Sequence, residues 1–426
     1  MSEFGKLGIN GMSVRALDEQ GLHVPTPVQK QVIPIVLRGD DVIAQAQTGT
    51  GKTLAFILPI IEKIDVSNPE IQALILTPTR ELALQITTES RKYAAEDINI
   101  LSIYGGQDVE KQMKQLQGAQ HIVIATPGRL LDHLRRGTVN LQRTAMFVLD
   151  EADQMLHMGF LEEVEEVIDQ IGKDRQTMLF SATIPHQVAS LAKRYMNNPV
   201  EVRIKTEKVT VDNIEQWVVE TTDRNKQAML RHLLDHYRPF LAIIFCRTRR
   251  RANTLCEALL ALGYNCDQLH GDISQSKRES VLQKFRNLEL QFMIATDVAG
   301  RGLDVDGVTH VFNYDIPHDA ESYIHRIGRT GRAGEQGVAI TLVAPKDQMH
   351  LQLIEKAIGI GIQRLNIRTP APQVRNEQGS KADPRVRERS SGKKIGSSVE
   401  KSESAYEMRR QKNIQANKNR MRKKKR

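Results

Sequence analysis

The sequence predicts an α/β protein with two doubly wound parallel-sheet lobes and a basic tail. Short apolar runs alternate with helical periods through the first 205 residues, the rhythm of a parallel sheet covered by helices. The same rhythm starts again after a polar stretch at residues 197–213. After Ile367 the composition changes to Pro, Gly, Ser, Lys and Arg. These three observations divide the chain into lobe 1 (1–205), lobe 2 (212–367) and a tail (368–426).

Both lobes are expected to contain several buried strands. Each is a short run rich in β-branched, Leu or Phe side chains. In lobe 1 the runs lie at residues 41–46, 72–77, 100–104, 121–126, 145–150 and 176–183. In lobe 2 they lie at residues 215–220, 241–246, 264–270, 292–297, 310–315 and 338–343. Because no obvious tandem sequence repeat links the two sets, we expect one architecture built from two different sequences.

The basic charge of the chain lies in its tail. Residues 368–426 hold 19 Lys and Arg against 6 Asp and Glu, whereas the first 367 residues hold 41 against 45. With Tyr406 as its sole aromatic residue, the tail cannot bury enough apolar surface to offset the entropy of ordering it. We expect a disordered arm that tethers RNA, with a solubilising or targeting tail as the alternative.

Composition and cysteine content indicate a soluble, intracellular protein. No run approaches the roughly 18 apolar residues of a membrane-spanning helix. The N-terminal stretch MSEFGKLGIN lacks the charged-then-apolar pattern of a signal peptide. The three cysteines, at positions 246, 256 and 266, include no CxxC pair and are too few for a disulfide framework. We therefore expect reduced cysteines, no membrane partner and a cytoplasmic location.

The stretch AQAQTGTGKT at residues 44–53 has the features of a phosphate-binding loop. It follows an apolar run and precedes an apolar helical segment at residues 54–64, the context that such a loop needs. Lys52 would reach the outer phosphates of a nucleotide, and the Thr53 hydroxyl would hold Mg²⁺. The spacing departs from G-x-x-x-x-G-K-[ST] at Ala46. The other nucleotide-binding residues of the loop are Thr48, Gly49, Thr50 and Gly51.

Carboxylates follow the run at residues 145–150. Asp150 ends that run, at the sheet edge where ligands bind in open α/β folds. It is therefore placed to hold Mg²⁺ opposite Thr53, and Glu151 is placed to orient and deprotonate an attacking water. Acidic residues after a strand are often only turn formers or helix caps, so this assignment depends on their pairing with the phosphate loop.

Lobe 2 offers a basic segment, HRIGRTGR, at residues 325–332. Arg326, Arg329 and Arg332 are spaced three apart and interleaved with glycines, which suits a clamp on negative charge better than a core. A solvated basic turn is the alternative. A nucleoside triphosphate site completed across a cleft by arginines of the second lobe explains both lobes together, because such arginines stabilise charge on the transferred phosphoryl group.

Residues 150–153 spell DEAD, and the chain resembles the DEAD-box ATP-dependent RNA helicases over about residues 4–332. The resemblance implies two RecA-like lobes, ATP and Mg²⁺ as cofactors, and RNA-stimulated ATP hydrolysis that unwinds short duplexes or remodels RNA–protein complexes. The stretch PTPVQ resembles the adenine-reading motif of the family, so Gln29 would bind the adenine edge and Thr26 would support the loop. Phe4 corresponds to the aromatic residue that packs on the base. Leu22 departs from the aromatic residue usual at its position.

The resemblance also assigns the remaining site residues. Asp304 would contact the ribose. Arg329 and Arg332 would be arginine fingers that complete a catalytic set with Lys52, Asp150 and Glu151. Residues 181–183, Ser-Ala-Thr, resemble the motif that couples hydrolysis to strand separation. The residues expected in this coupling are Asp153, Ser181, Thr183 and His325.

RNA-facing motifs of the family match loops at strand ends or helix starts, where N–H groups, hydroxyls and arginines can meet phosphates. In lobe 1 they are Pro78, Thr79, Arg80, Gly105, Gly106, Thr126, Pro127, Gly128 and Arg129. In lobe 2 they are Gln275, Arg278 and Thr296. None of these loops has a base-reading set of side chains, so we expect contacts to the RNA backbone without sequence preference.

Two other functions use much of the same machinery. An ATP-gated RNA clamp or assembly factor would need the same residues, and strand displacement on a short RNA duplex separates it from a helicase. A DNA-directed translocase is disfavoured by the adenine motif and by the DEAD spelling. We expect a monomer whose partners include RNA in ribosomal or mRNA-decay complexes. The physiological RNA stays open, since ribosome assembly, mRNA decay and cold adaptation all use such enzymes.

Overall fold

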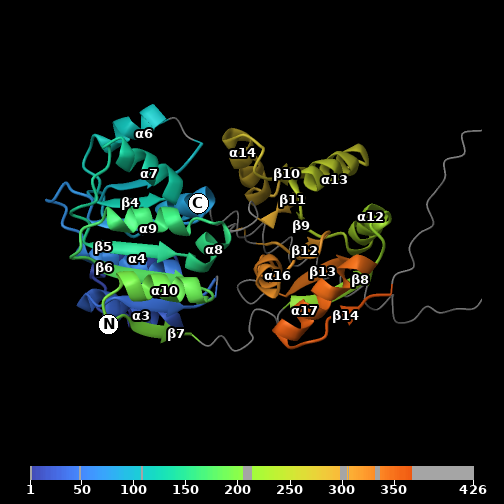
Figure 1. Ribbon diagram of the computed structural model, residues 1–426, viewed down its shortest axis with the longest axis horizontal. Coiled ribbons are helices and arrows are strands. Elements are labelled where there is room, and N and C mark those ends of the chain that lie inside the picture. Colours follow the sequence, from blue (N-terminus) through green and yellow to red (C-terminus); the bar gives the residue numbers. More distant parts are fainter. Residues whose placement is uncertain are drawn as a thin grey trace, which may run out of the picture.

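The computed structural model describes residues 2–47, 49–106, 109–204, 214–297, 305, 307–331 and 336–366. Two lobes stand side by side, and each contains a seven-stranded sheet between layers of helices (Figure 1). The strand pairs in both sheets are parallel. The predicted fold of two doubly wound lobes is therefore confirmed, while the tail at 368–426 lies outside the described residues.

Lobe 1 is built from seven strands and the helices between them. The strands are β1 (Val42–Gln45), β2 (Ala73–Leu76), β3 (Ile100–Ile103), β4 (Ile122–Ala125), β5 (Met146–Asp150), β6 (Gln176–Ser181) and β7 (Val200–Arg203). The helices are α1 (Glu3–Lys6), α2 (Gly11–Glu19), α3 (Pro27–Arg38), α4 (Lys52–Lys63), α5 (Arg80–Ser90), α6 (Val109–Leu116), α7 (Pro127–Arg135), α8 (Ala152–His157), α9 (Leu161–Asp169) and α10 (His186–Tyr195). The strand order is β3-β4-β2-β5-β6-β1-β7.

Lobe 2 repeats this plan. Its strands are β8 (Ile214–Glu220), β9 (Ala242–Cys246), β10 (Cys266–Leu269), β11 (Phe292–Thr296), β12 (His310–Asn313), β13 (Gly337–Val343) and β14 (Gln363–Arg364). Its helices are α12 (Lys226–Tyr237), α13 (Arg249–Ala261), α14 (Gln275–Arg286), α16 (Ala320–Ile327), η1 (Pro345–Asp347) and α17 (Gln348–Ile358). The order β10-β11-β9-β12-β13-β8-β14 assigns every strand a counterpart in lobe 1. In particular, β8 corresponds to β1 and β12 corresponds to β5.

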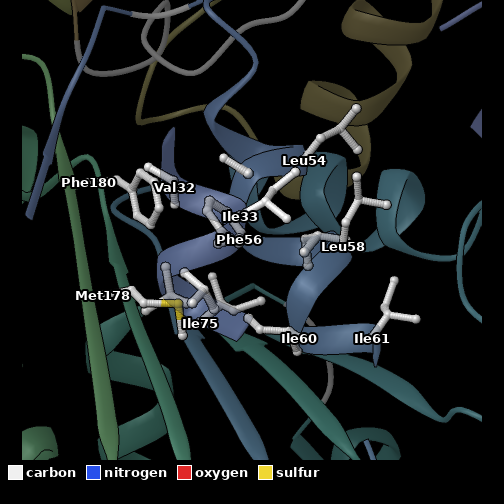
Figure 2. Packing of buried hydrophobic residues seen from close by; sticks show 14 of the residues in the cluster. Val32, Ile33, Leu54, Phe56, Leu58, Ile60, Ile61, Ile75, Met178 and Phe180 are labelled. Carbon is white, nitrogen blue, oxygen red and sulfur yellow. The ribbon is translucent and has the colours of Figure 1, made fainter. Parts of the chain in front are cut away.

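Apolar side chains cover both faces of each sheet, as parallel sheets require. In lobe 1, α3, α4 and α5 pack on one face and α7, α8, α9 and α10 on the other. Figure 2 shows Phe56 of α4 and Phe180 of β6 in the first of these cores, where their ring centroids lie 5.0 Å apart. In lobe 2, α12 and α13 cover one face, while α14, α16 and α17 cover the other. The packing leaves the carboxyl edge of each sheet available for polar loops.

Two strands were not expected from the sequence. The strands β7 and β14 lie at the outer edges of the two sheets, and most of their side chains are exposed. Each pairs with a single neighbour, β1 or β8. Because an edge strand needs few apolar residues, neither segment has the apolar run that marks a buried strand.

Cys246, Cys256 and Cys266 are free thiols, and all three are buried. Within the described part of the chain, no helix has both the length and the apolar character needed to cross a membrane.

Candidate active site

The phosphate loop connects β1 to α4 at the carboxyl edge of the lobe 1 sheet. Gly49 has a φ of 82° and Gly51 a φ of 87°, left-handed conformations that favour glycine. The hydroxyl of Thr50 donates to Gln47 O at 2.8 Å and closes the turn. The backbone therefore adopts the turns predicted for a phosphate nest; Thr48 lies outside the described residues.

Lys52 follows the phosphate loop as the first residue of α4, and its ammonium contacts the backbone of the loop. Its side chain is almost buried, and its ammonium donates to Ala46 O at 2.8 Å. Thr53 follows it in the first turn of α4. The lysine charge and the positive end of the helix thus lie at the same point, which favours a phosphate group there. Thr53 adds a hydroxyl oxygen, which is a suitable ligand for Mg²⁺.

Thr26 and Gln29 connect the adenine motif to this loop. They form a capping box at the start of α3: Thr26 N donates to Gln29 Oε1 at 2.9 Å, and the Thr26 hydroxyl accepts from Gln29 N. The other end of the Gln29 amide donates from Nε2 to Gly51 O at 3.0 Å. A Cβ atom on Gly51 would lie 2.5 Å from that nitrogen, so this approach requires glycine. The adenine motif therefore contacts the phosphate loop directly.

Phe4, which the resemblance assigns to packing on the base, is buried in lobe 1, and that role stays a prediction. Its ring is only 2% exposed and belongs to the hydrophobic core of lobe 1, together with Ile9 and Leu17. An aromatic ring gains more free energy from such burial than from an exposed position. Phe4 therefore packs the N-terminal helices onto the lobe. Leu22, by contrast, is 36% exposed and lies between α2 and Thr26.

Asp150 and Glu151 stand at the carboxyl end of β5, as predicted. Asp150 is the last residue of the strand, and its Oδ1 accepts from Glu151 N at 3.0 Å. Glu151 caps α8 with a φ of 55° and a ψ of 50°, which is unusual for a residue with a long side chain. Such strained conformations cluster at functional sites, because surrounding structure must hold them. Glu151 also lines the cavity between the two lobes.

The environment of these carboxylates favours proton transfer near neutral pH. Burial and the neighbouring Asp150 carboxylate raise the pKa of Glu151 to about 7, while the charges of Lys52 and Arg329 oppose the shift. Burial also raises the pKa of Asp150, and Lys52 again opposes it. Glu151 Oε2 is buried without a hydrogen-bond partner among the described residues. A carboxylate oxygen of this kind is suited to accept a proton or hydrogen bond from a reacting water.

The expected coupling residues of lobe 1 form one hydrogen-bonded network, in which Asp153 and Ser181 are buried and Thr183 is half-buried. Asp153 Oδ2 accepts from Thr183 N at 2.7 Å, from the Thr183 hydroxyl at 3.0 Å and from Ala182 N at 3.1 Å. The Ser181 hydroxyl in turn accepts from Asp153 N at 3.1 Å. A movement of the carboxylate segment would therefore be transmitted directly to residues 181–183.

A narrow cavity lies where the lobes meet. Lobe 1 lines it with Lys52, Glu151, Asp153, Gln154 and Ala182, and lobe 2 lines it with His325 and Arg329. Arg329 lies just beyond α16 and is almost buried, with its Nε donating to His325 O at 3.2 Å. The structure thus brings a lobe 2 arginine to the phosphate-loop lysine and the carboxylate of lobe 1. Asp304 and Arg332 lie outside the described residues.

Several of the expected RNA-facing residues meet across the two lobes. Arg80 Nη1 donates to Gln275 Oε1 at 3.0 Å, and a Cβ atom on Gly106 would lie 2.3 Å from the same guanidinium nitrogen. The guanidinium of Arg278 forms an ion pair with Glu81. Arg80, Gly105, Gly106 and the start of α14 therefore form one cluster. Glu81 also belongs to this cluster, and its position beside Arg80 is the sequence feature that points to it.

The other expected RNA contacts lie at separate places in lobe 1, except Thr296, which lies in lobe 2. Thr79 caps α5 by accepting from Leu82 N at 3.3 Å. Thr126 precedes α7, which begins with Pro127, and Arg129 donates to Gln112 Oε1 at 3.0 Å. The remaining expected residues are Pro78, which is buried, Gly128, which is exposed, and Thr296, which ends β11. These positions lie at strand ends or helix starts, as predicted.

Known protein families match both lobes. The DEAD/DEAH box helicase model matches residues 26–191, and the helicase conserved C-terminal domain model matches residues 225–334. The chain is 48% identical over 366 residues to the DEAD-box ATP-dependent RNA helicase CshA of Geobacillus kaustophilus, covering 86% of this chain and 78% of that protein. It is 44% identical over 379 residues to the protein of the same name from Bacillus cereus, covering 89% and 72%.

Solved structures resemble the whole two-lobe arrangement. One is S. cerevisiae Dbp5 bound to RNA and ADP BeF3, with a TM-score of 0.79, 33% identity, and coverage of 86% of this chain and 96% of that one. Another is Mss116p bound to ssRNA and AMP-PNP, with a TM-score of 0.77, 29% identity, and coverage of 86% and 80%.

Proposed function

The chain belongs to the DEAD-box family of ATP-dependent RNA helicases, and from this premise we propose how its residues divide the reaction between the lobes. Lobe 1 binds ATP and holds the group that activates water. Lobe 2 supplies the arginines that complete the site once the cleft closes. The observation that carries this proposal is the cavity lined by Lys52 and Glu151 from one lobe and Arg329 from the other.

ATP binding is assigned mainly to lobe 1, and the ribose contact is assigned to Asp304 of lobe 2. Gln29 holds the adenine edge while its amide stays bonded to Gly51 O, so that base recognition and loop geometry depend on each other. The loop N–H groups and Lys52 hold the phosphates. The oxygen donors of Thr53 and Asp150 fit Mg²⁺, which prefers such ligands and, when bound, neutralises charge on the phosphate oxygens.

Hydrolysis requires both lobes. Glu151 orients the attacking water and accepts its proton, for which its raised pKa of about 7 is well suited. Arg329 and Arg332 stabilise the charge that develops on the transferred phosphoryl group. Because Arg329 belongs to lobe 2, hydrolysis is possible only when the lobes are together.

RNA binding and lobe closure favour each other. RNA lies against strand ends and helix starts of both lobes through its phosphates and sugars, so ATP and RNA both stabilise the closed arrangement. Closure bends one strand and separates a short duplex locally. Hydrolysis then weakens the closed state, and the network of Asp153 with Thr183 transmits the change. The enzyme acts as a monomer in the cytoplasm on RNA in ribosomal or mRNA-decay complexes.

A substitution of Glu151 tests this division. Glu151→Gln removes the proton acceptor but keeps the shape of the side chain, so steady-state ATPase activity should fall by about 10²–10⁴-fold. ATP and RNA binding should remain. The matched control is Glu162→Gln, which removes an exposed carboxylate on α9. Normal ATPase activity in Glu151→Gln would exclude the role assigned to this residue.

A further inference from the structure

Lobe 2 contains a counterpart of the phosphate-loop lysine. β1 and β8 each occupy the sixth position in the spatial order of their sheet. Each strand leads into a helix of 12 residues that begins with lysine. These lysines are Lys52 and Lys226, with relative exposures of 7% and 1%. The connection before Lys226 is TTDRN at residues 221–225, without glycine. Lobe 2 therefore keeps the lysine position without the phosphate loop.

The carboxylate opposite this lysine also has a counterpart. Asp150 ends β5, the fourth strand of its sheet, and Asp315 lies two residues past the end of β12, the fourth strand of the other. In lobe 2 the ammonium of Lys226 lies 3.4 Å from Asp315 Oδ1 and 3.2 Å from Asp347 Oδ2. Both carboxylates are buried. The charge of Lys226 is thus neutralised inside the lobe.

This buried cluster joins the carboxyl ends of three neighbouring strands. Asp315, after β12, accepts from Arg247 N at 3.0 Å, and Arg247 follows β9. Arg251 on α13 lies 2.9 Å from Asp315 Oδ1. Asp347, after β13, accepts from Ala344 N at 3.3 Å. Arg247 Nη2 also lies 3.5 Å from Asp347 Oδ1. Because Lys226 is the cation that contacts both carboxylates, its loss would leave Asp315 and Asp347 without the group that joins them, each paired with an arginine of its own.

The cluster connects to the arginine segment through Asp315. The backbone carbonyl of Asp315 accepts from Arg326 Nη1 at 2.6 Å. Arg326 is buried and also donates to Asp297 Oδ2 at 2.7 Å. It lies on α16, three residues before Arg329. A shift of Asp315 would therefore move the end of α16 and with it Arg329.

We propose that Lys226 is a positioning residue that keeps Arg329 in register with the site of lobe 1. The inference rests on the proposed role of Arg329 in hydrolysis. Lys226 itself touches no substrate. Its ion pair holds Asp315 in place, and the Asp315 carbonyl in turn holds Arg326 near the end of α16. A displacement of about 1 Å at a catalytic group is enough to lower a rate by about 100-fold.

The test is a double-mutant cycle between Lys226→Met and Arg329→Ala, assayed at saturating ATP and RNA. Lys226→Met should lower kcat by about 10- to 100-fold. ATP affinity measured without RNA should stay within about threefold, since lobe 1 makes those contacts. In the Lys226→Met background, Arg329→Ala should cost far less than it does alone, because the arginine is already misplaced. The control is Lys346→Met, which removes an exposed lysine paired with Asp223 at the rim of the same cluster.

The outcomes separate this inference from the proposed function. If Arg329→Ala leaves kcat unchanged, the role of Arg329 fails and the inference fails with it. If Arg329→Ala stops turnover while Lys226→Met does not, or if the two losses simply multiply, only the positioning role is excluded. If Lys226→Met does not fold, the charge-balanced variant Lys226→Met/Asp347→Asn replaces it in the cycle. Non-additivity with Arg329→Ala then supports the inference, and additivity overturns it.

Discussion

The two lobes share one strand order but use the same sheet edge differently. In lobe 1 the lysine after β1 begins α4 at the end of a glycine-containing loop, and two carboxylates after β5, Glu151 and Asp153, line the cavity between the lobes. In lobe 2 the corresponding lysine is enclosed by Asp315 and Asp347, and what reaches the cleft is Arg329. One frame therefore supports a ligand site in the first lobe and an internal ion cluster in the second. In the proposed mechanism, each lobe supplies part of what hydrolysis needs.

The largest effect is expected from removing the contribution of lobe 2 to the cleft. Arg329→Ala should lower the RNA-stimulated ATPase rate by about 10³–10⁵-fold, the range found for arginine fingers. ATP binding should persist because it depends on lobe 1. The measurement is a single-turnover ATPase assay with RNA, beside Arg231→Ala, which removes an exposed arginine from α12. A rate within about tenfold of the parent enzyme would exclude Arg329 as the contribution of lobe 2 to hydrolysis.

A smaller effect should follow from altering the lobe 1 loop. Gly51→Ala would force a left-handed alanine and place its Cβ against the Gln29 amide, so ATP affinity should fall by about 10- to 100-fold. The control is Gly39→Ala, at a φ of 92° at the end of α3, which adds similar backbone strain away from Gln29. Calorimetric titration with ATP distinguishes them. Equal losses of affinity in both variants would mean that the contact between Gln29 and Gly51 has no specific role.

The contacts that hold the lobes together should have a more modest effect. Glu81→Gln removes the partner of Arg278 across the lobes, and the RNA concentration for half-maximal ATPase stimulation should rise by about 5- to 20-fold. The rate at saturating RNA should change little. Lys277→Met on the same helix breaks only an exposed pair with Asp267 and serves as the control. If Glu81→Gln instead lowers the maximal rate and leaves half-saturation unchanged, the pair acts in hydrolysis and not in closure.

The fold could be predicted from the sequence because twelve runs of apolar residues mark buried strands, and the structure contains a strand at each. The strands β7 and β14 escaped prediction because they lie at exposed edges and have few apolar residues. Local patterns identify a strand by what it buries. An edge strand that is held mainly by hydrogen bonds to one neighbouring strand has no such pattern of apolar residues.

The candidate site was predictable where motifs are local. The loop from Gly49 to Thr53 and the carboxylates after β5 are continuous stretches, and their placement at one sheet edge follows from parallel strands. Their chemical roles stay predictions. Lys226 could not be selected in the same way, because its partners Asp315 and Asp347 are 89 and 121 residues away in the sequence. The burial of Phe4 could not be predicted either, because a sequence motif does not show whether an aromatic ring packs into the core.

The smallest effect is expected from removing the basic tail, because the excess positive charge of the chain lies there and not in the lobes. The first 367 residues carry 41 basic against 45 acidic side chains, so long-range attraction of RNA must come from residues 368–426, with 19 against 6. Ending the chain after residue 366 should weaken RNA binding by about threefold at 0.15 M salt and more at lower salt. The slope of log affinity against log salt should become shallower, while kcat at saturating RNA stays unchanged.

A full-length variant with Lys423, Lys424 and Lys425 changed to Gln separates charge from length: it should shift the slope in the same direction by a smaller amount. Unchanged affinity of the shortened chain at every salt concentration would assign all RNA attraction to the local groups of the two lobes.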